Sequence, residues 1–188
     1  TKRNAIQNFY PVGTRIVMID DDIKDIVVKE GNKKRSIIDF DKMVSFCFIN
    51  SDFYKSKIWG LYPIGNPFFM KNIFRTKLCY IIASCFGFIN TRFSVESNYA
   101  EDVERSLIYY KDQGLLFRVD FVGIETNYYK EPGGLQETRT EEKNYLAKKV
   151  LAETFSDFCK LGEKRGRAEI IYKRTPNKNI EYSEPLPF

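Results

Sequence analysis

A short apolar run that ends in three carboxylates constrains this chain more than any other feature. Residues 16–19 read Ile-Val-Met-Ile, and Asp20, Asp21 and Asp22 follow directly. An apolar run of this length is typical of a buried strand, and an acidic cluster at its end projects oxygen ligands from the rigid edge of a sheet. Mg²⁺ and Mn²⁺ prefer such ligands and often share them with substrate phosphates. The pattern is compatible with a metal site and also with a solvated acidic turn.

Length and composition indicate one compact domain. The chain has 188 residues, of which 43% are hydrophobic and 15% aromatic, which is enough for a sizeable core. The most apolar segment, residues 78–90, is interrupted by Ser84 and Gly87, so we expect no membrane span. The sequence starts at Thr1 without an initiator Met or a signal-peptide core, and we expect that it was processed or that an upstream segment is missing.

The chain has no histidine and no C-x-x-C pair. The missing histidine eliminates Ser-His-Asp and Cys-His nucleophilic sites and any His-ligated metal. The four cysteines lie mostly in apolar surroundings, where a reduced thiol behaves as a small hydrophobe. We therefore expect a reducing compartment, the cytoplasm (the host cytoplasm if the protein is viral), and no zinc site. Acid–base chemistry would fall to carboxylates, lysine or tyrosine.

The periodicity of apolar residues predicts an α/β or α+β sheet protein. The first helix should turn Ala5, Ile6 and Phe9 inward. Glycine and asparagine at positions 31 and 32 predict a hairpin turn, residues 131–136 a loop, and residues 176–188 a mobile tail after a domain that spans 1–175. We predict helices at residues 1–10, 41–51, 99–112 and 140–155, and strands at residues 16–19, 26–30, 35–40, 57–62, 78–83 with an extension towards 89, 115–121, 124–129 and 168–172.

Several motifs occur in an order that resembles a known family. Arg3-Asn4 precedes the acidic cluster, Glu101-Asp102 opens a later helix, and a glycine loop carries Arg139 just beyond it. This order resembles the GT-A-fold glycosyltransferases of large DNA viruses, phages and some protists, parts of which are called TET-associated glycosyltransferases. The resemblance covers about residues 1–173. It is most specific in four sequence segments: WGLYPIGNPFFM at 59–70, YIIASCFG at 80–87, TNYYKEPGGLQ at 126–136 and RT at 139–140.

The resemblance implies a GT-A-like, Rossmann-like mixed sheet flanked by helices. In that fold a substantial stretch normally precedes the acidic motif, whereas here only 19 residues do. Part of the N-terminal nucleoside-binding half is therefore expected to lie upstream, to come from a partner chain, or not to exist. Many metal-dependent members also add a C-terminal histidine to the metal. A third ligand in this chain would be Asp, Glu, a backbone oxygen or water.

The implied reaction transfers a hexose from a nucleotide-sugar donor, a UDP-sugar such as UDP-glucose, to an acceptor hydroxyl. Asp20 and Asp22 would hold Mn²⁺ or Mg²⁺ against the donor diphosphate, and Asp21 would orient the ribose or share the metal. Asp102 would be the general base, which gives inversion at the sugar. The acceptor would be a hydroxymethylated DNA base or a glycan.

The resemblance also suggests residues that contact the donor and the acceptor. Each of these residues also has an ordinary structural interpretation. Basic side chains are usually solvated, two adjacent glycines usually form an ordinary turn, and at least half of the aromatic candidates should belong to the core. Phe68 and Phe69 are further candidates for stacking on a sugar or base. The donor contacts would be Arg3 and Asn4 at the nucleotide, Lys130 and Arg139 at the pyrophosphate and Gly133 and Gly134 in a lid; the acceptor or sugar contacts would be Trp59, Tyr62, Asn66 and Glu101.

Other functions fit parts of the same pattern. A GT-A-like binding module without turnover would explain the short N-terminus, and a Mg²⁺-dependent nuclease or phosphotransferase would use the acidic cluster, although no P-loop is present. Glu101 and Asp102 would otherwise be helix caps. The net charge of +5 and the basic run at 160–167 are compatible with DNA contacts through Lys164, Arg165 and Arg167, or with a solvated loop before the last strand.

Overall fold

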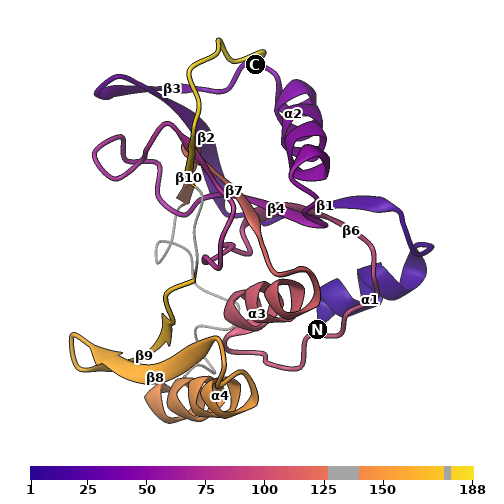
Figure 1. Ribbon diagram of the computed structural model, residues 1–188, viewed down its shortest axis with the longest axis vertical. Helices are drawn as coiled ribbons and strands as arrows, with labels where there is room; N and C mark the ends of the chain where they lie inside the picture. The colour runs from indigo at the N-terminus through magenta and orange to yellow at the C-terminus, as the bar shows by residue number, and fades with distance from the viewer. Residues whose placement is uncertain (127–139, 176–178) are drawn as a thin grey trace.

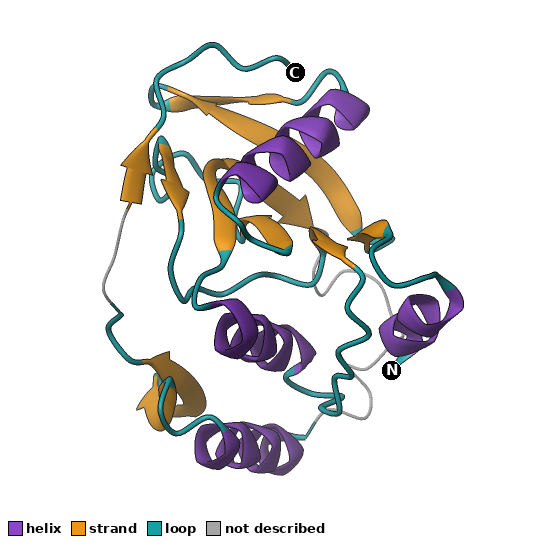
Figure 2. Ribbon diagram, turned by 45° about the vertical axis from the view of Figure 1, so that its right-hand side comes forward, coloured by secondary structure: helices purple, strands orange, loops and turns teal. Residues whose placement is uncertain are grey.

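The computed structural model describes residues 1–126, 140–175 and 179–188. The described chain is an α/β protein with a mixed sheet flanked by helices (Figures 1 and 2). Its helices are α1 (Lys2–Phe9), α2 (Phe40–Phe53), α3 (Glu101–Gln113) and α4 (Glu141–Thr154). Its strands are β1 (Arg15–Ile19), β2 (Ile23–Glu30), β3 (Lys33–Ser36), β4 (Ile58–Tyr62), β5 (Ile73–Arg75), β6 (Cys85–Ile89), β7 (Phe117–Thr126), β8 (Cys159–Lys164), β9 (Arg167–Tyr172) and β10 (Asn179–Glu181).

The main sheet is built around β7. Its strand order is β1-β6-β4-β7-β2-β3, with β5 paired to the first half of β7 and β10 paired to β5. β4 and β7 run parallel, and the other pairs of this sheet are antiparallel. β8 and β9 form a separate antiparallel hairpin that lies beside α4 (Figure 1). The expected mixed sheet flanked by helices is confirmed at this level.

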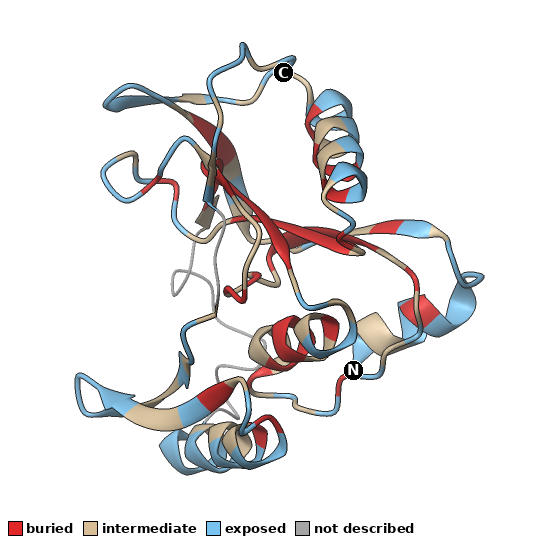
Figure 3. Ribbon diagram, in the orientation of Figure 1, coloured by how far each residue is buried: buried red, intermediate tan, exposed pale blue. Residues whose placement is uncertain are grey.

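Two hydrophobic clusters cover the two faces of the sheet. Successive side chains of a strand point to opposite faces, so Phe117, Val119 and Phe121 of β7 join the cluster that includes Met43 and Cys47 of α2. The other cluster contains buried residues of α3, α4 and β6. Figure 1 shows α2 and α3 on opposite sides of the sheet, and Figure 3 shows burial concentrated in the central strands and in α3.

Trp59 belongs to the core and is fully buried. It pairs with Gly87 across β4 and β6, and a Cβ at position 87 would lie 2.4 Å from indole atoms of Trp59. Its ring also meets Phe48 edge to face at 5.6 Å. The suggested sugar or acceptor contact through Trp59 is therefore wrong, because the indole has no exposed surface. Glycine at position 87 makes the room that the indole needs.

The first helix forms where it was predicted, but with a different buried face. Gln7 is the buried residue of α1, whereas Ile6 is 39% exposed and Phe9 is 81% exposed. Asn90 donates from its side-chain amide to the carbonyls of Gln7 and Tyr10 at 2.8 and 2.9 Å. Polar contacts with the chain after β6 therefore fix α1, and the predicted inward apolar stripe is wrong.

Most other predicted elements are confirmed, but several differ. The strand expected at 35–40 is β3, Lys33–Ser36, and α2 already begins at Phe40. Residues 73–75 form the unpredicted strand β5, and residues 78–83 are not a strand, because β6 begins at Cys85. Leu78 and Ile81 are nevertheless buried, since an apolar run predicts burial better than it predicts backbone pairing. The two extended segments expected at 115–121 and 124–129 form one strand, β7, which is described as far as Thr126.

The basic run at 160–167 is part of a hairpin and not a loop before the last strand. β8 and β9 pair from Cys159↔Tyr172 to Lys164↔Arg167. The turn places Arg165 and Gly166 at φ values of 52° and 75°, in the left-handed region that glycine tolerates best. The many charges of β8 hide its strand periodicity.

The C-terminal residues also differ from the expected mobile tail. β10 pairs with β5, and the Tyr182 amide donates to the Asn72 carbonyl at 2.9 Å. Phe188 is only 5% exposed, and its ring lies 5.3 Å from that of Phe46 in α2. None of the described helices is long and apolar enough to cross a membrane.

The burial of Phe188 predicts that the last residue stabilises the fold. Phe188→Ala should lower the free energy of unfolding by about 3 kcal/mol, the low end for loss of a buried phenylalanine, in urea unfolding. Phe68→Ala is the matched control, because Phe68 is 85% exposed, and it should change stability by less than about 0.5 kcal/mol. Equal effects of the two variants would contradict the packing of the C-terminus.

Candidate functional site

The acidic cluster follows β1 at the edge of the sheet. The Asp20 amide donates to the carbonyl of Ser84 at 2.8 Å, and Ile19 pairs with Cys85, so the end of β1 is fixed to the start of β6. Asp20 and Asp22 are partly buried, whereas Asp21 is exposed. The predicted strand that ends in carboxylates is present, and it presents two of the three carboxylates to the interior side.

Arg3 connects this cluster to α3. Its Nη2 group donates to Asp20 and, at 3.1 Å, to the carbonyl of Ala83. Its Nη1 group donates to Glu101 at 3.1 Å, and Glu101 also accepts from Arg105 at 2.5 Å. One guanidinium therefore holds together α1, the end of β1 and the first turn of α3. Arg3, which was expected at the nucleotide, therefore contacts Asp20, one of the two expected metal ligands.

The charge of Asp20 is not fully compensated. Burial raises the pKa of Asp20 above its ordinary value, and the nearby carboxylates of Asp22 and Glu101 raise it further, while Arg3 opposes them. A raised pKa means that the surroundings disfavour the ionised carboxylate. An added cation would reverse this imbalance, so the cluster has the electrostatic character of a cation site.

Asp22 supplies an independent observation. Its Oδ1 atom is buried and has no hydrogen-bond partner within the described part of the chain. A buried carboxylate oxygen without a partner is costly, and a metal ion would satisfy it. Among residues 1–126, 140–175 and 179–188, no group of three Asp, Glu, Cys or His side chains lies close enough to hold a metal. Asp20 and Asp22 fit a hard cation only if water, backbone or ligand oxygens complete its shell.

Asp102 lies in the first turn of α3 and has two partners. Its Oδ2 atom accepts from the hydroxyl of Tyr80, and its Oδ1 atom accepts from the amide of Val103 at 2.9 Å. The N-cap position itself is Ala100, which makes no side-chain cap bond. The Asp102 carboxylate therefore satisfies one of the free amides of the helix start and is also held by a tyrosine hydroxyl. Both the capping role and a chemical role are compatible with this geometry.

Two tyrosines near Asp102 were not singled out by the sequence analysis. Tyr80 lies within residues 78–83, which were predicted to form a strand, and Tyr172 ends β9. The Tyr172 hydroxyl is buried and makes no hydrogen bond of ordinary geometry among the described residues, although the Ser106 side chain is close enough to lower its pKa. Burial raises the pKa of Tyr172 strongly, and the Asp102 carboxylate raises it further. No local motif marks either residue, because the chain fold alone brings them to α3.

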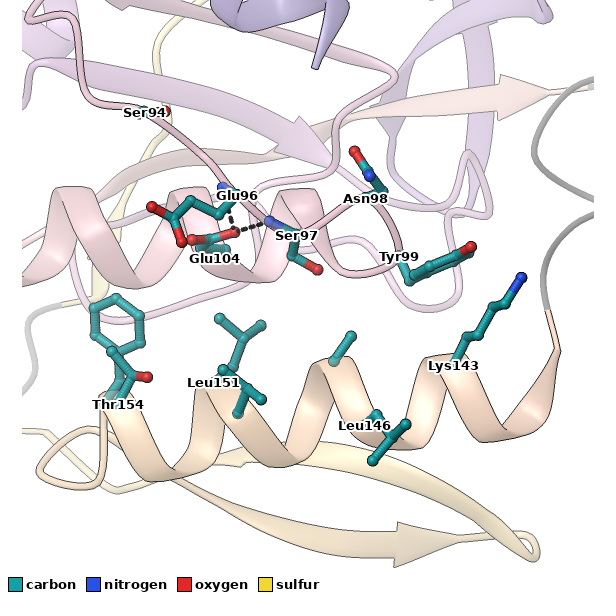
Figure 4. A pocket seen from close by; sticks show the side chains of 13 residues that line it. Ser94, Glu96, Ser97, Asn98, Tyr99, Glu104, Lys143, Leu146, Leu151 and Thr154 are labelled. Carbon is teal, nitrogen blue, oxygen red and sulfur yellow. Dashed lines mark hydrogen bonds between the residues drawn. The ribbon is translucent and has the colours of Figure 1, made fainter.

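A cavity of about 630 Å³ lies between the segment 94–99 and α4 (Figure 4). Apolar residues of α4, including Leu146, Val150 and Leu151, line one wall. Glu104 lines the opposite wall and accepts from the amides of Glu96 and Ser97 at 3.1 and 2.7 Å. Of the expected site residues that the structure describes, none lines this cavity.

The other expected contacts have varied surroundings. The side-chain amide of Asn4 donates to the Val95 carbonyl at 2.8 Å, so it fixes the segment before α3. The ring of Tyr62 lies 5.1 Å below the guanidinium of Arg118. Asn66 is exposed and accepts from the Phe68 amide at 3.0 Å. The residues expected at the pyrophosphate and in the lid, Lys130, Gly133, Gly134 and Arg139, lie outside the described residues.

No family model, no curated protein and no solved structure matches this chain.

The raised pKa of Asp20 predicts how this residue affects stability. Because the pKa of Asp20 is higher in the folded than in the unfolded protein, ionisation of Asp20 lowers the free energy of unfolding. This cost is absent at low pH and grows as the pH rises through the raised folded-state pKa. Asp20→Asn should therefore stabilise the protein at about pH 7, and the gain should shrink at about pH 4, near the ordinary pKa of an aspartate. Thermal unfolding at both pH values measures this difference.

Asp21→Asn is the control with the same change in charge, because Asp21 is exposed. It should leave the unfolding temperature nearly unchanged. If Asp20→Asn is instead less stable than the unchanged protein at neutral pH, the pair with Arg3 outweighs burial and the description of the site is wrong.

Proposed function

We propose that this protein is a metal-dependent glycosyltransferase that moves a hexose from a nucleotide-sugar, a UDP-sugar, to an acceptor hydroxyl with inversion. The observation that carries the proposal is the unpartnered, buried Oδ1 atom of Asp22 beside Asp20. Glu101 of α3, which the resemblance assigns to the acceptor or sugar, is tied to Asp20 by Arg3. The motif resemblance supports the reaction class, and the acidic site supports the need for a cation.

Asp20 and Asp22 would hold Mn²⁺ or Mg²⁺. Two carboxylates leave most of a six-ligand shell to water and donor phosphate oxygens, which is the usual arrangement for Mg²⁺. The ion would neutralise negative charge on the departing nucleoside diphosphate. Arg3 compensates part of the charge of Asp20, so the carboxylate is already oriented before a cation arrives.

Asp102 would accept the proton of the acceptor hydroxyl. The acceptor oxygen forms the new bond to the sugar, the bond from the sugar to the diphosphate breaks, and the proton passes to the carboxylate. The hydroxyl of Tyr80 donates to Asp102. Tyr80 thus orients the proposed base.

The acceptor in this proposal is a hydroxymethylated DNA base or a glycan. The basic side chains suggested for DNA, Lys164, Arg165 and Arg167, lie at the β8–β9 turn. Figure 1 shows this turn on the opposite side of the molecule from α1, whereas Arg3 of α1 contacts the acidic cluster. This placement gives no support to these three residues as contacts for DNA near the proposed centre.

The metal proposal predicts that nucleotide binding needs both carboxylates. Isothermal calorimetry with UDP should show tighter binding when Mn²⁺ is present. Asp20→Ala or Asp22→Ala should remove this gain. Mutation of a side chain that only hydrogen-bonds a metal ligand typically lowers metal affinity by roughly 10-fold to 100-fold, so loss of a ligand itself should lower it by more. Asp41→Ala, an exposed carboxylate on α2, should retain it. Equal affinity for UDP with and without Mn²⁺ in the unchanged protein would rule out the metal role.

The base proposal predicts that Asp102→Asn eliminates turnover. Loss of a general base costs on the order of a hundredfold to ten-thousandfold in rate, while binding of UDP and Mn²⁺ should be nearly unchanged. Loss of a helix cap costs roughly 1 kcal/mol of stability and little activity. Sugar transfer, calorimetry and thermal unfolding on one preparation separate the two roles. Early melting with normal transfer would assign Asp102 to capping alone.

A GT-A-like binding module without turnover is the second candidate. It is favoured by the small number of protein ligands, since no three acidic, Cys or His side chains in the described ranges are grouped closely enough to hold a metal ion. Such a module would bind UDP with Mn²⁺ and release no free UDP from a UDP-sugar. Its Asp102→Asn variant would then behave like the unchanged protein in every binding measurement.

A further inference from the structure

The cavity along α4 is not used by the proposed reaction. Its volume of about 630 Å³ is within the range of roughly 300 to 1,000 Å³ that is typical of small-molecule sites. Figure 4 shows α4 as one wall and the segment 94–99 with α3 as the opposite wall. Glu104 of α3 fixes that segment, because its carboxylate accepts from the amides of Glu96 and Ser97. The cavity is therefore built into the fold.

The α4 wall is apolar and accessible to solvent. Leu146 and Val150 line the cavity, and their spacing of four residues places them on one face of the helix. Their exposed fractions are 50% and 57%, although both side chains are apolar. Leu151 and Phe155 also line the cavity and are buried in the core cluster that includes residues of α3. This wall thus offers apolar surface that an apolar ligand would remove from water.

The opposite wall carries two carboxylates without a cationic partner. Glu96 is exposed, whereas Glu104 is only 8% exposed. Within the described part of the chain, neither forms an ion pair with a lysine or an arginine. Lys111 lies 5.9 Å from the ring of Phe155 but does not line the cavity. Because a buried charge is costly unless it is paired, this wall favours a cation.

One lysine also lines the cavity, at a distance from these carboxylates. The ammonium of Lys143 lies 5.9 Å from the centre of the Tyr99 ring. Figure 4 shows Lys143 and Tyr99 together, separated along α4 from Glu96 and Glu104. The whole chain has a net charge of +5, so the negative charge of this wall is local and opposite in sign to that of the protein. The wall should therefore select cations over anions.

We propose that this cavity binds an organic cation with an apolar body, such as an alkylamine. The cationic group lies against Glu96 and Glu104, and the apolar body lies along Leu146 and Val150. A hydrogen bond to an ionised group is roughly twice as strong as a neutral one, and the apolar wall adds burial. The site does not depend on the glycosyltransferase function, because none of the described residues proposed for the metal, the donor or the base lines it.

Ligand titrations observed by NMR test the site with three probes that share one apolar chain. Hexylamine presents a cation, hexanol a neutral hydroxyl and hexanoate an anion. Glu96→Gln and Glu104→Gln each remove one negative charge. Glu163→Gln is the matched control, because Glu163 is exposed on β8 and does not line the cavity. Thermal unfolding checks the fold of each variant, and exposed Glu96 keeps the test open if Glu104→Gln does not fold.

Hexylamine should bind the unchanged protein roughly tenfold more tightly than hexanol or hexanoate, the gain expected for one charge-assisted contact. Glu96→Gln and Glu104→Gln should each weaken hexylamine binding several-fold more than Glu163→Gln does, and they should leave hexanol binding nearly unchanged. Leu146→Ala should weaken hexylamine and hexanol alike, because it removes contacts with the chain that both probes share. Binding of UDP with Mn²⁺ should be the same in all these variants.

Four outcomes would overturn the site. The first three are no saturable binding of hexylamine, hexanol binding as tightly as hexylamine, and effects of the cavity glutamates no larger than that of Glu163→Gln. The fourth is a dimer of the unchanged protein in sedimentation that becomes a monomer in Leu146→Ala, which would assign the apolar wall to a second copy of the chain. Loss of UDP binding in the unchanged protein would contradict the glycosyltransferase proposal alone, because hexylamine binding is measured without nucleotide.

Discussion

The alternation of side chains along β7 is the constraint on which the rest of the molecule depends. β7 pairs with β4, β2 and β5, so it joins the two halves of the main sheet. Phe117, Val119 and Phe121 pack towards α2, while Arg118 and Asp120 carry charge to the face that α3 covers. A shift of one residue in register would exchange these faces, placing charges in one core and aromatic rings at the candidate site. The apolar packing on one face therefore fixes the polar groups on the other.

A second constraint is the pair of ion pairs from Arg3 to Asp20 and Glu101. The Arg3 guanidinium thereby connects α1, the residue after β1 and the first turn of α3. Around it, negative groups are crowded enough to disfavour ionised Asp20, and Asp22 has a buried oxygen without a partner. Such features cost stability, and proteins tend to concentrate perturbed groups of this kind at functional sites.

The sequence predicted local structure and the acidic site better than it predicted packing. The strand before Asp20 and helices α2, α3 and α4 follow from periodicity and from polar residues at their starts, and the structure confirms them. The buried face of α1 could not be predicted, because asparagine contacts from the chain after β6 decide it. Trp59 looked like a possible sugar platform, but its burial depends on the absence of a side chain at Gly87 in a neighbouring strand. The surroundings of Tyr80 and Tyr172, and the ion pair between Arg75 and the buried Asp120, depend on contacts between distant segments, which no local motif encodes.

The central claim is that Asp20 and Asp22 form a divalent-cation site. Electron paramagnetic resonance of Mn²⁺ tests it most directly, because bound and free Mn²⁺ give different signals and no turnover is needed. With UDP present, the unchanged protein should bind one Mn²⁺ per chain, and Asp22→Asn should leave the ion free at the same concentrations. Asp21→Asn, which changes an exposed neighbour by the same charge, should weaken binding less than Asp22→Asn does. Equal binding of Mn²⁺ by Asp22→Asn and the unchanged protein would contradict the assignment.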